Sequence, residues 1–177
     1  MFSLLRILIS LIQPKQLPNK LYFMKLATLC YIVDKVNNKT LMIHRVKKEN
    51  DMHEGKWNGL GGKFERGESP EDCVIREIYE ESGLRIVNPL LKGFVTFPAF
   101  DGLEDWYVFM FLADNYSGDI IESKEGNLEW VESDKLMDLP LWEGDRTFIP
   151  WMFGDKFFSA KLVYADKQFV KHEVFFY

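Results

Sequence analysis

The sequence has few cysteines, no excess of basic residues and no hydrophobic run long enough to span a bilayer. Its two cysteines, Cys30 and Cys73, do not have metal-ligand spacing. We interpret both as small buried hydrophobic residues in a reducing compartment, the cytoplasm. The net charge of −5, from 22 basic and 27 acidic residues, excludes binding of duplex nucleic acid through a basic surface. The three histidines lack partners at metal-ligand spacing.

The first 23 residues differ from the rest of the chain. Their apolar run from Leu4 to Ile12 contains one arginine and is too short to cross a bilayer. It also lacks the basic start and the small-residue cleavage site of a signal peptide. We therefore interpret residues 1–23 as an N-terminal extension, either the product of an upstream start codon or an amphipathic helix, and a membrane contact of this segment stays open. The folded domain is expected to span residues 24–177.

The remaining residues have the composition of one globular domain, with 47% hydrophobic and 15% aromatic residues. Alternating apolar residues predict several strands, with turns at asparagine, aspartate and glycine between them. One helix is expected from Pro70 to about Gly83 and a second from Asp145. The expected strands are residues 24–33, 40–46, 85–100, 105–112, 160–165 and 168–176. These elements predict an α/β or α+β fold, with a mixed β-sheet sandwiched between α-helices.

The first predicted helix carries three glutamates on one face. Glu77, Glu80 and Glu81 have i, i+3, i+4 spacing and fall within an arc of about 100°. Because neighbouring like charges repel, a hard cation with oxygen ligands would stabilise this face. The opposite side is apolar and suits a core: Val74, Ile75, Ile78 and Tyr79.

The ends of this helix are also marked in the sequence. Ser69 is a good N-cap, Pro70 suits the first helical position, and Gly83 can adopt the left-handed conformation after the last turn. A surface helix with a solvated acidic face is the simpler alternative. The Gly61-Gly62 pair just before the helix and Arg76 among the acids favour a functional site instead.

The stretch GKFERGESPEDCVIREIYEESGL, from Gly62 to Leu84, has a recognisable pattern. It consists of G, five residues, E, seven residues, R-E, an aliphatic, any residue, E-E, any residue, G and an aliphatic. This pattern resembles the Nudix box, and every position is filled: Gly62, Glu68, Arg76, Glu77, Ile78, Glu80, Glu81, Gly83 and Leu84. The resemblance implies the Nudix fold and a Mg²⁺-dependent hydrolase, with Mn²⁺ as an alternative metal. Such enzymes cleave a pyrophosphate bond in a nucleoside diphosphate linked to another group.

The resemblance also implies roles for residues of the box. It implies metal ligands at the carbonyl of Gly61 and the carboxylates of Glu77, Glu80 and Glu81. Glu81 would be the central ligand of the catalytic site, and Glu77 is the first candidate for orienting or deprotonating the attacking water. Arg76 is expected to pair with a box carboxylate such as Glu68, so that both provide structural support.

A further catalytic and metal-binding glutamate outside the box is expected in the loop before the strand at Glu129. Glu122, Glu125 and Glu129 are the candidates. We favour Glu125, because Gly126 follows it and the loop is expected to face the metal site. A solvated loop acid is an equally good interpretation of any one of them.

Beyond the box, three segments resemble MutT-type oxidised-purine nucleoside triphosphatases: residues 56–63, 122–125 and 141–145. By this resemblance, Asn58 and Asp145 would hydrogen-bond the base edge and Trp142 would stack on the base. Met52 would line the same pocket, and Lys48 and Lys63 would contact phosphate. The mammalian pattern has two adjacent aspartates where this chain has Gly144-Asp145.

Three functions follow from these observations. The first is hydrolysis of an oxidised purine nucleoside triphosphate such as 8-oxo-dGTP to the monophosphate and pyrophosphate, which sanitises the nucleotide pool and supports DNA repair. The second is a Nudix hydrolase acting on a dinucleoside polyphosphate or ADP-ribose. The third is a regulator that binds a nucleotide without turnover, which the complete set of box glutamates disfavours. The sequence leaves monomer and homodimer open.

Overall fold

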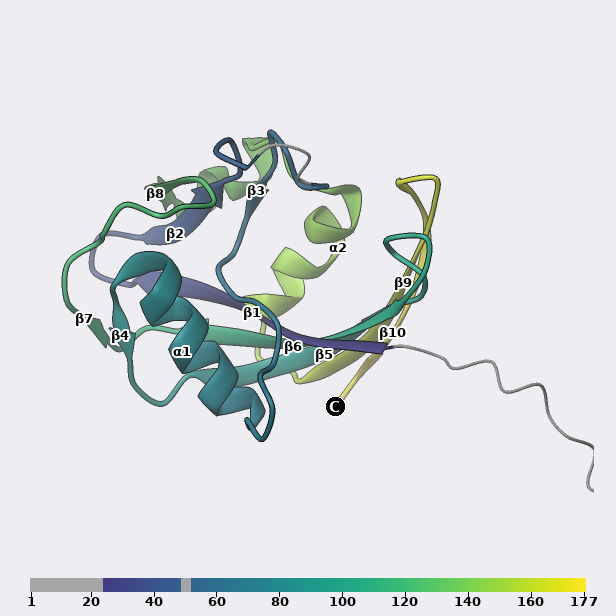
Figure 1. The fold of residues 1–177 in the computed structure, drawn as a ribbon, viewed down its shortest axis with the longest axis horizontal. Helices are drawn as coiled ribbons and strands as arrows, with labels where there is room; N and C mark the ends of the chain where they lie inside the picture. The colour runs from purple at the N-terminus through teal and green to yellow at the C-terminus, as the bar shows by residue number, and fades with distance from the viewer. Residues whose placement is uncertain (1–23, 49–51) are drawn as a thin grey trace, which may run out of the picture.

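The computed structural model describes residues 24–48 and 52–177, and the predictions made for residues 1–23 lie outside this range. A mixed β-sheet of eight strands forms the centre of the molecule, and its strands follow the order β10-β9-β5-β6-β1-β2-β3, with β8 paired to β2 (Figure 1). A two-stranded sheet pairs β4 with β7. The strands are β1 (Met24–Asp34), β2 (Lys39–His44), β3 (Trp57–Asn58), β4 (Arg85–Ile86), β5 (Leu90–Phe97), β6 (Asp105–Ala113), β7 (Tyr116–Ser117), β8 (Asn127–Glu132), β9 (Phe158–Ala165) and β10 (Gln168–Phe176).

The sheet contains both parallel and antiparallel pairs, as expected for a mixed sheet. β1 runs parallel to β6, from Met24 opposite Asp105 to Ile32 opposite Ala113. β5 runs antiparallel to β6 and parallel to β9. β1–β2, β2–β8 and β9–β10 are antiparallel. The predicted C-terminal hairpin is therefore confirmed.

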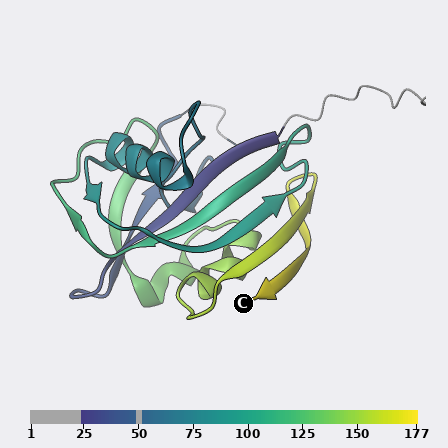
Figure 2. The same cartoon turned by 90° about the horizontal axis from the view of Figure 1, so that it is seen from below.

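One helix covers each face of the sheet: α1 (Pro70–Ser82) lies on one side and α2 (Glu143–Met152) on the other (Figure 2). The alternation of β1 explains this arrangement, because successive side chains of a strand point to opposite faces. Cys30 belongs to the core cluster that contains Val74 and Ile78 of α1. Its neighbour Tyr31 belongs to the cluster that contains Phe148 of α2. The predicted sandwich of a mixed sheet between helices is confirmed.

The ends of α1 have the predicted geometry. The Ser69 side chain accepts a hydrogen bond from the backbone N–H of Asp72, and the Asp72 side chain accepts one from the backbone N–H of Ser69. This reciprocal capping box satisfies two N–H groups at the helix start. Gly83 ends the helix with φ 77°, in the left-handed region that glycine adopts most readily.

Several predicted boundaries are wrong. Residues 85–100 form two strands rather than one, β4 and β5, because Asn88 has a φ of 50° and Pro89 follows it. The strand expected over residues 40–46 is β2, which starts at Lys39 and ends at His44. The helix expected from Asp145 starts at Glu143, two residues earlier, with Trp142 as its N-cap. A short 3₁₀ helix, η2 (Ser133–Asp138), precedes it.

None of the helices in the described part of the chain combines the length and the hydrophobicity needed to cross a membrane.

Candidate active site

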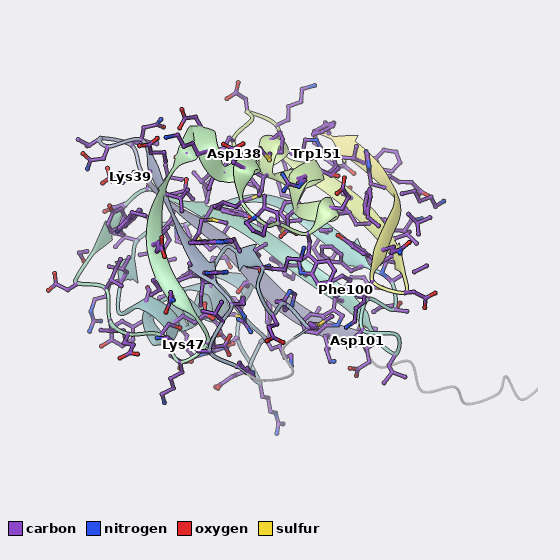
Figure 3. The ribbon with its side chains drawn as sticks, turned by 90° about the horizontal axis from the view of Figure 1, so that it is seen from above. Lys39, Lys47, Phe100, Asp101, Asp138 and Trp151 are labelled. Atoms are coloured by element: carbon purple, nitrogen blue, oxygen red, sulfur yellow. The ribbon has the colours of Figure 1, made fainter. Side chains whose placement is uncertain are left out.

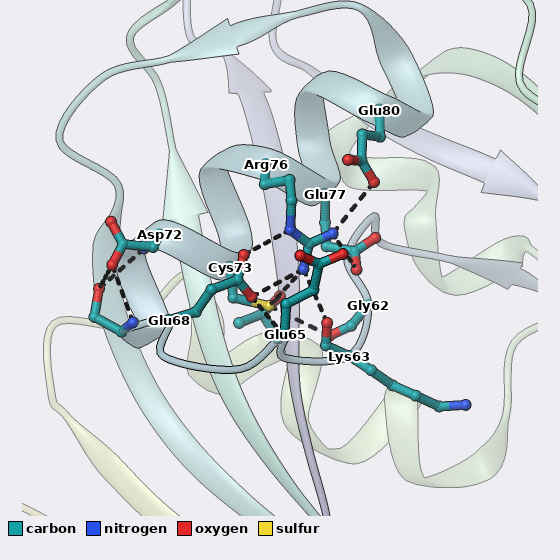
Figure 4. Close-up of polar contacts among 11 residues, drawn as sticks. Gly62, Lys63, Glu65, Glu68, Asp72, Cys73, Arg76, Glu77 and Glu80 are labelled. Atoms are coloured by element: carbon teal, nitrogen blue, oxygen red, sulfur yellow. Dashed lines mark hydrogen bonds and ion pairs between the residues drawn. The ribbon is translucent and has the colours of Figure 1, made fainter.

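Arg76 holds together the turn before α1 and the acidic face of the helix (Figure 4). Its Nε and one terminal nitrogen donate to the two carboxylate oxygens of Glu68, at 2.6 and 2.9 Å. Its other terminal nitrogen lies 2.9 Å from Glu77 and 3.2 Å from Glu80. Arg76 also donates to the backbone carbonyl of Lys63 at 3.0 Å. The expected pairing of Arg76 with Glu68 is thus present, and it lowers the pKa of Glu68 to about 2.

Glu81 lies deeper than the other two glutamates of this face. One of its carboxylate oxygens accepts a hydrogen bond from the backbone N–H of Gly61 at 2.9 Å. Burial raises the pKa of Glu81 to about 8, and the negative charges of Glu125 and Glu77 act in the same direction. Burial also raises the pKa of Glu77. A group of carboxylates that disfavour one another's ionisation is therefore concentrated beside Gly61.

The glycine pair before the helix is required by close packing. Gly61 has a φ of 142°, and a Cβ there would overlap the backbone carbonyl oxygen of Thr28 in β1. A Cβ on Gly62 would overlap the carboxylate of Glu77. Glycine at both positions lets this turn pass between β1 and α1, so the Gly61 backbone reaches Glu81.

Glu125 is the loop acid that the structure brings to this group. Its charge is close enough to raise the pKa of both Glu77 and Glu81. It forms an ion pair with Arg45 and lies 3.7 Å from the Lys48 ammonium. By contrast, the competing loop acid Glu122 is 87% exposed and pairs with Lys47.

Two further features of this loop support the same choice. Glu129, the third competitor, is exposed on β8. Gly126 fixes the loop against β2, because a Cβ there would overlap the carbonyl oxygen of His44. Of the three acids, the geometry favours Glu125.

The donor set fits a hard divalent cation. All the charged oxygens here are carboxylates, which Mg²⁺ prefers, and their mutual repulsion would be relieved by a cation. Within residues 24–48 and 52–177, no three Asp, Glu, His or Cys side chains already converge as metal ligands. In the structure, Arg76 engages Glu77 and Glu80, while Arg45 engages Glu125. The ligand roles of Gly61, Glu77, Glu80, Glu81 and Glu125 therefore stay predictions that require these side chains to change partners.

A cavity of about 160 Å³ adjoins the carboxylates. Gly61, Gly62 and Arg45 form part of its wall, so the cavity and the acidic group share one site. The aromatic side of the wall includes Phe100, which lies beside Asp101 between β5 and β6 (Figure 3). The lining residues are Ala27, Thr28, Leu29, Arg45, Met52, His53, Asn58, Gly59, Gly61, Gly62, Phe97, Phe100, Trp106, Val108, Trp142, Asp145, Phe148 and Tyr164.

Two polar atoms in this cavity have no hydrogen-bond partner among the described residues: Asn58 Oδ1 and Asp145 Oδ2. Asp145 is only 6% exposed. Burial raises its pKa to about 7, although the charges of Lys56 and Arg146 oppose this change. Because unpartnered buried polar atoms destabilise a fold, two of them in one cavity indicate a ligand that supplies the missing donors.

The indole of Trp142 is fixed at the edge of this cavity. Its Nε1 donates to His53 Nδ1 at 2.9 Å. The Lys56 ammonium lies 5.4 Å from the centre of its ring. Phe100 and Tyr164 contact it edge-on, with ring centres 5.7 and 6.0 Å away. An indole held in this way is preorganised to contact a flat ligand.

The other residues expected to bind substrate lie around the same site. Met52 lines the cavity. Lys63 is exposed and its ammonium lies 5.4 Å above the ring of Trp106, another lining residue. Lys48 is near Glu125, on the side of the carboxylates. The structure thus brings Asn58, Met52, Trp142 and Asp145 together in the cavity and puts the two lysines at its charged edge.

Sequence reasoning missed three residues of this site. Arg45 pairs with Glu125 and lines the cavity, His53 accepts the Trp142 hydrogen bond, and Tyr164 contributes its ring to the wall. The contact of His53 with Trp142 was missed because metal-ligand spacing was the only signal considered for the histidines. Tyr164 could have been noticed as an aromatic residue on β9, the strand that follows α2.

Comparison with known proteins identifies the family. The model of the NUDIX domain matches residues 24–152, which is most of the chain. The chain belongs to the Nudix family. Members of this family are hydrolases that act on nucleotide substrates and generally use divalent metal ions, so this Nudix protein is an enzyme of that class.

Several relatives are similar over much of their length. An uncharacterized Nudix hydrolase, YvcI of Bacillus subtilis, is 39% identical over 120 residues, 66% of this chain and 72% of the relative. The oxidized purine nucleoside triphosphate hydrolase of Mus musculus is 32% identical, over 68% of this chain and 77% of the relative. The crystal structure of a MutT protein from Bacillus halodurans superposes with a TM-score of 0.75 and 29% identity, covering 85% of this Nudix chain and 97% of that one.

Proposed function

We propose that this Nudix hydrolase converts a purine nucleoside triphosphate, in particular an oxidised one such as 8-oxo-dGTP, to the monophosphate and pyrophosphate. The observation that carries the proposal is the pair of unpartnered oxygens, Asn58 Oδ1 and Asp145 Oδ2, in a cavity whose wall includes Gly61 and Gly62, the neighbours of Glu81 and Glu77. A guanine-type base offers a ring N–H and an amino N–H along one edge, and the two oxygens could accept hydrogen bonds from them. The adjacent Trp142 offers a flat apolar surface for the base.

The relatives support the same substrate class. Two curated relatives, from Danio rerio and Mus musculus, are named oxidized purine nucleoside triphosphate hydrolases and are 37% and 32% identical to this chain. The segments that carry the base-contact prediction, around Asn58 and Trp142–Asp145, lie within the matched domain.

Residues outside the base pocket would hold the metal and act on the triphosphate. Glu77, Glu80, Glu81, Glu125 and the Gly61 carbonyl would hold Mg²⁺. When bound, the metal would neutralise phosphate charge and lower the pKa of a coordinated water. Glu77 is the first candidate for accepting the proton of the attacking water.

Cationic side chains would bind the triphosphate at the edge of the cavity. Lys48 and Lys63 would contact its oxygens, because an ammonium group and a phosphate oxygen attract each other strongly at short range. Arg45, which pairs with Glu125 in the structure, would release this carboxylate when it binds the metal. Arg76 and Glu68 would support the helix face without contacting substrate.

The test is a comparison of kcat/KM for several substrates with Mg²⁺: 8-oxo-dGTP, dGTP, 2-oxo-dATP, ADP-ribose and a diadenosine polyphosphate. We expect the highest value for an oxidised purine triphosphate. The Glu81→Gln protein, checked by circular dichroism for folding, should lose at least about a hundredfold in turnover because a central metal ligand is lost. A preference for ADP-ribose or the dinucleotide would refute the proposed substrate. Nucleotide binding without any turnover would instead indicate a regulator.

A further inference from the structure

The structure offers an explanation for the missing second aspartate of the base pocket. At Gly144, a Cβ would overlap the hydroxyl of Tyr164 and come within 2.7 Å of Leu162 Cδ2. The space in which a side chain at position 144 would begin is therefore filled by the Tyr164 hydroxyl. Tyr164 comes from β9 and lines the same cavity as Asn58 and Asp145.

The hydroxyl has a defined hydrogen-bond state. It accepts a hydrogen bond from the backbone N–H of Gly144 at 2.8 Å, in the first turn of α2. A phenol hydroxyl has one proton to donate besides its acceptor lone pairs. Burial and the charge of Asp145 raise the pKa of Tyr164, so the proton stays on the oxygen at neutral pH. Tyr164 is thus a donor at a place where the two-aspartate pattern has a carboxyl group.

The ring that carries this hydroxyl is held on several sides. Phe100 and Phe169 contact it edge-on, with ring centres 5.0 and 5.5 Å away, and Trp142 does so at 6.0 Å. With the Gly144 hydrogen bond, these contacts fix the position of the oxygen. A hydrogen-bond donor fixed in this way favours a base with an acceptor at the facing position over a base with a donor there.

We infer that Tyr164 is a specificity-determining residue, whose hydroxyl replaces the second carboxyl group and selects purines with an acceptor at C6. This inference rests on the proposed function and adds the substrate subclass. A 6-oxo purine, as in guanine and 8-oxoguanine, would accept the Tyr164 proton while its N–H groups donate to Asn58 and Asp145. A 6-amino purine, as in 2-oxoadenine, offers the hydroxyl a donor at that atom and leaves the Tyr164 proton unpartnered.

The test compares kcat/KM for 8-oxo-dGTP and 2-oxo-dATP in the wild-type and Tyr164→Phe proteins. The wild type should prefer the 6-oxo substrate, and Tyr164→Phe should lower the ratio of the two values about two- to tenfold, as expected for one neutral hydrogen bond. Tyr107→Phe is a matched control, because Tyr107 lies on β6 beside Phe94 and is not among the residues that line the cavity. It should leave the ratio unchanged.

The effect of Tyr164→Phe on both substrates separates base selection from support of the helix, and a double variant tests the packing at position 144. Tyr164→Phe also removes the partner of the Gly144 N–H. If the hydroxyl only supports the helix, the substitution should lower kcat/KM for both substrates equally. Gly144→Asp alone should reduce the melting temperature, because its Cβ overlaps the hydroxyl. Gly144→Asp combined with Tyr164→Phe removes the closest of these overlaps, the one with the hydroxyl, and leaves Leu162 Cδ2 at 2.7 Å. The double variant should therefore have a higher melting temperature than Gly144→Asp alone.

The outcomes distinguish this inference from the proposed function. A wild-type protein that hydrolyses no purine triphosphate refutes both. A wild type that prefers 8-oxo-dGTP, with an unchanged ratio in Tyr164→Phe, overturns only the inference. Equal losses on both substrates in Tyr164→Phe would also overturn it, because the hydroxyl would then support the helix without selecting the base.

Discussion

The burial of Asp145 destabilises the folded protein when its carboxyl group is ionised. Replacing it by asparagine should therefore raise the stability at high pH and lower the activity. The carboxyl group is buried, and its pKa is raised from 3.8 to about 7. This difference of about three pKa units corresponds to about 4 kcal/mol at a pH above both values. The nearby charges of Lys56 and Arg146 favour the ionised form, while Tyr31 and Tyr164 are neutral and close to it.

The direction of the pH effect follows from proton binding. Because the folded pKa is raised, the folded state binds a proton more tightly than the unfolded state between pH 3.8 and about 7. The free energy of unfolding therefore falls as pH rises through this window and levels off above it. Between pH 5 and pH 8, the Asp145 contribution falls by about 2 to 3 kcal/mol. The amide introduced by Asp145→Asn cannot ionise, so the variant lacks this loss.

The assay is thermal unfolding of both proteins at pH 5 and pH 8. The melting temperature of Asp145→Asn relative to the wild type should increase by about 5 to 10 °C between the two conditions. At pH 8 the same variant should hydrolyse its purine substrate more slowly, because an oxygen acceptor of the pocket is altered. Other titrating groups are shared by both proteins and cancel in the comparison. An equal difference in melting temperature at both pH values would refute the reasoning.

Two further predictions test the support of the carboxylates. Arg76→Lys should lower the melting temperature and slow turnover about tenfold, because lysine cannot reproduce the two-atom contact with Glu68; unchanged turnover would contradict the supporting role. Gly126→Ala should destabilise the fold by about 1 to 3 kcal/mol and lower turnover, because the new Cβ overlaps the His44 carbonyl. The control Gly154→Ala has its nearest atom at 3.5 Å and should change neither quantity, and an equal effect of both substitutions would refute the packing argument.

The parts of the site that the sequence predicted best are local. The helix of Glu77 and Glu81 follows from signals close to it in the chain, since Ser69 caps its start and Gly83 its end. The strand alternation of β1 likewise predicts which side chains face each helix. The split between β4 and β5 was missed, because a positive φ at Asn88 interrupts an otherwise strand-like pattern.

The parts that could not be predicted depend on contacts between distant residues. Arg45 meets Glu125 across 80 positions and Trp142 meets His53 across 89. No period or motif in the sequence connects these pairs, because each arises from how the loops fold over the sheet. In the sequence, Gly144 was read only as the absence of one of two adjacent aspartates. The structure instead puts the Tyr164 hydroxyl in the freed space.

The contacts between the acidic side chains and their partners are also not indicated by the motif. The box pattern indicates which carboxylates lie on one face. It does not indicate that Arg76 engages Glu77 and Glu80. Side-chain partners depend on the local balance of charge and burial, which the spacing of residues does not contain.

The most direct test of the central claim is product analysis by ³¹P NMR. The wild-type protein would be incubated with 8-oxo-dGTP and Mg²⁺, with Glu81→Gln as the inactive control. We expect equal amounts of nucleoside monophosphate and pyrophosphate from the wild type and at least about a hundredfold less of both from the control in the same time. Release of orthophosphate with a nucleoside diphosphate, or equal turnover by both proteins, would contradict it.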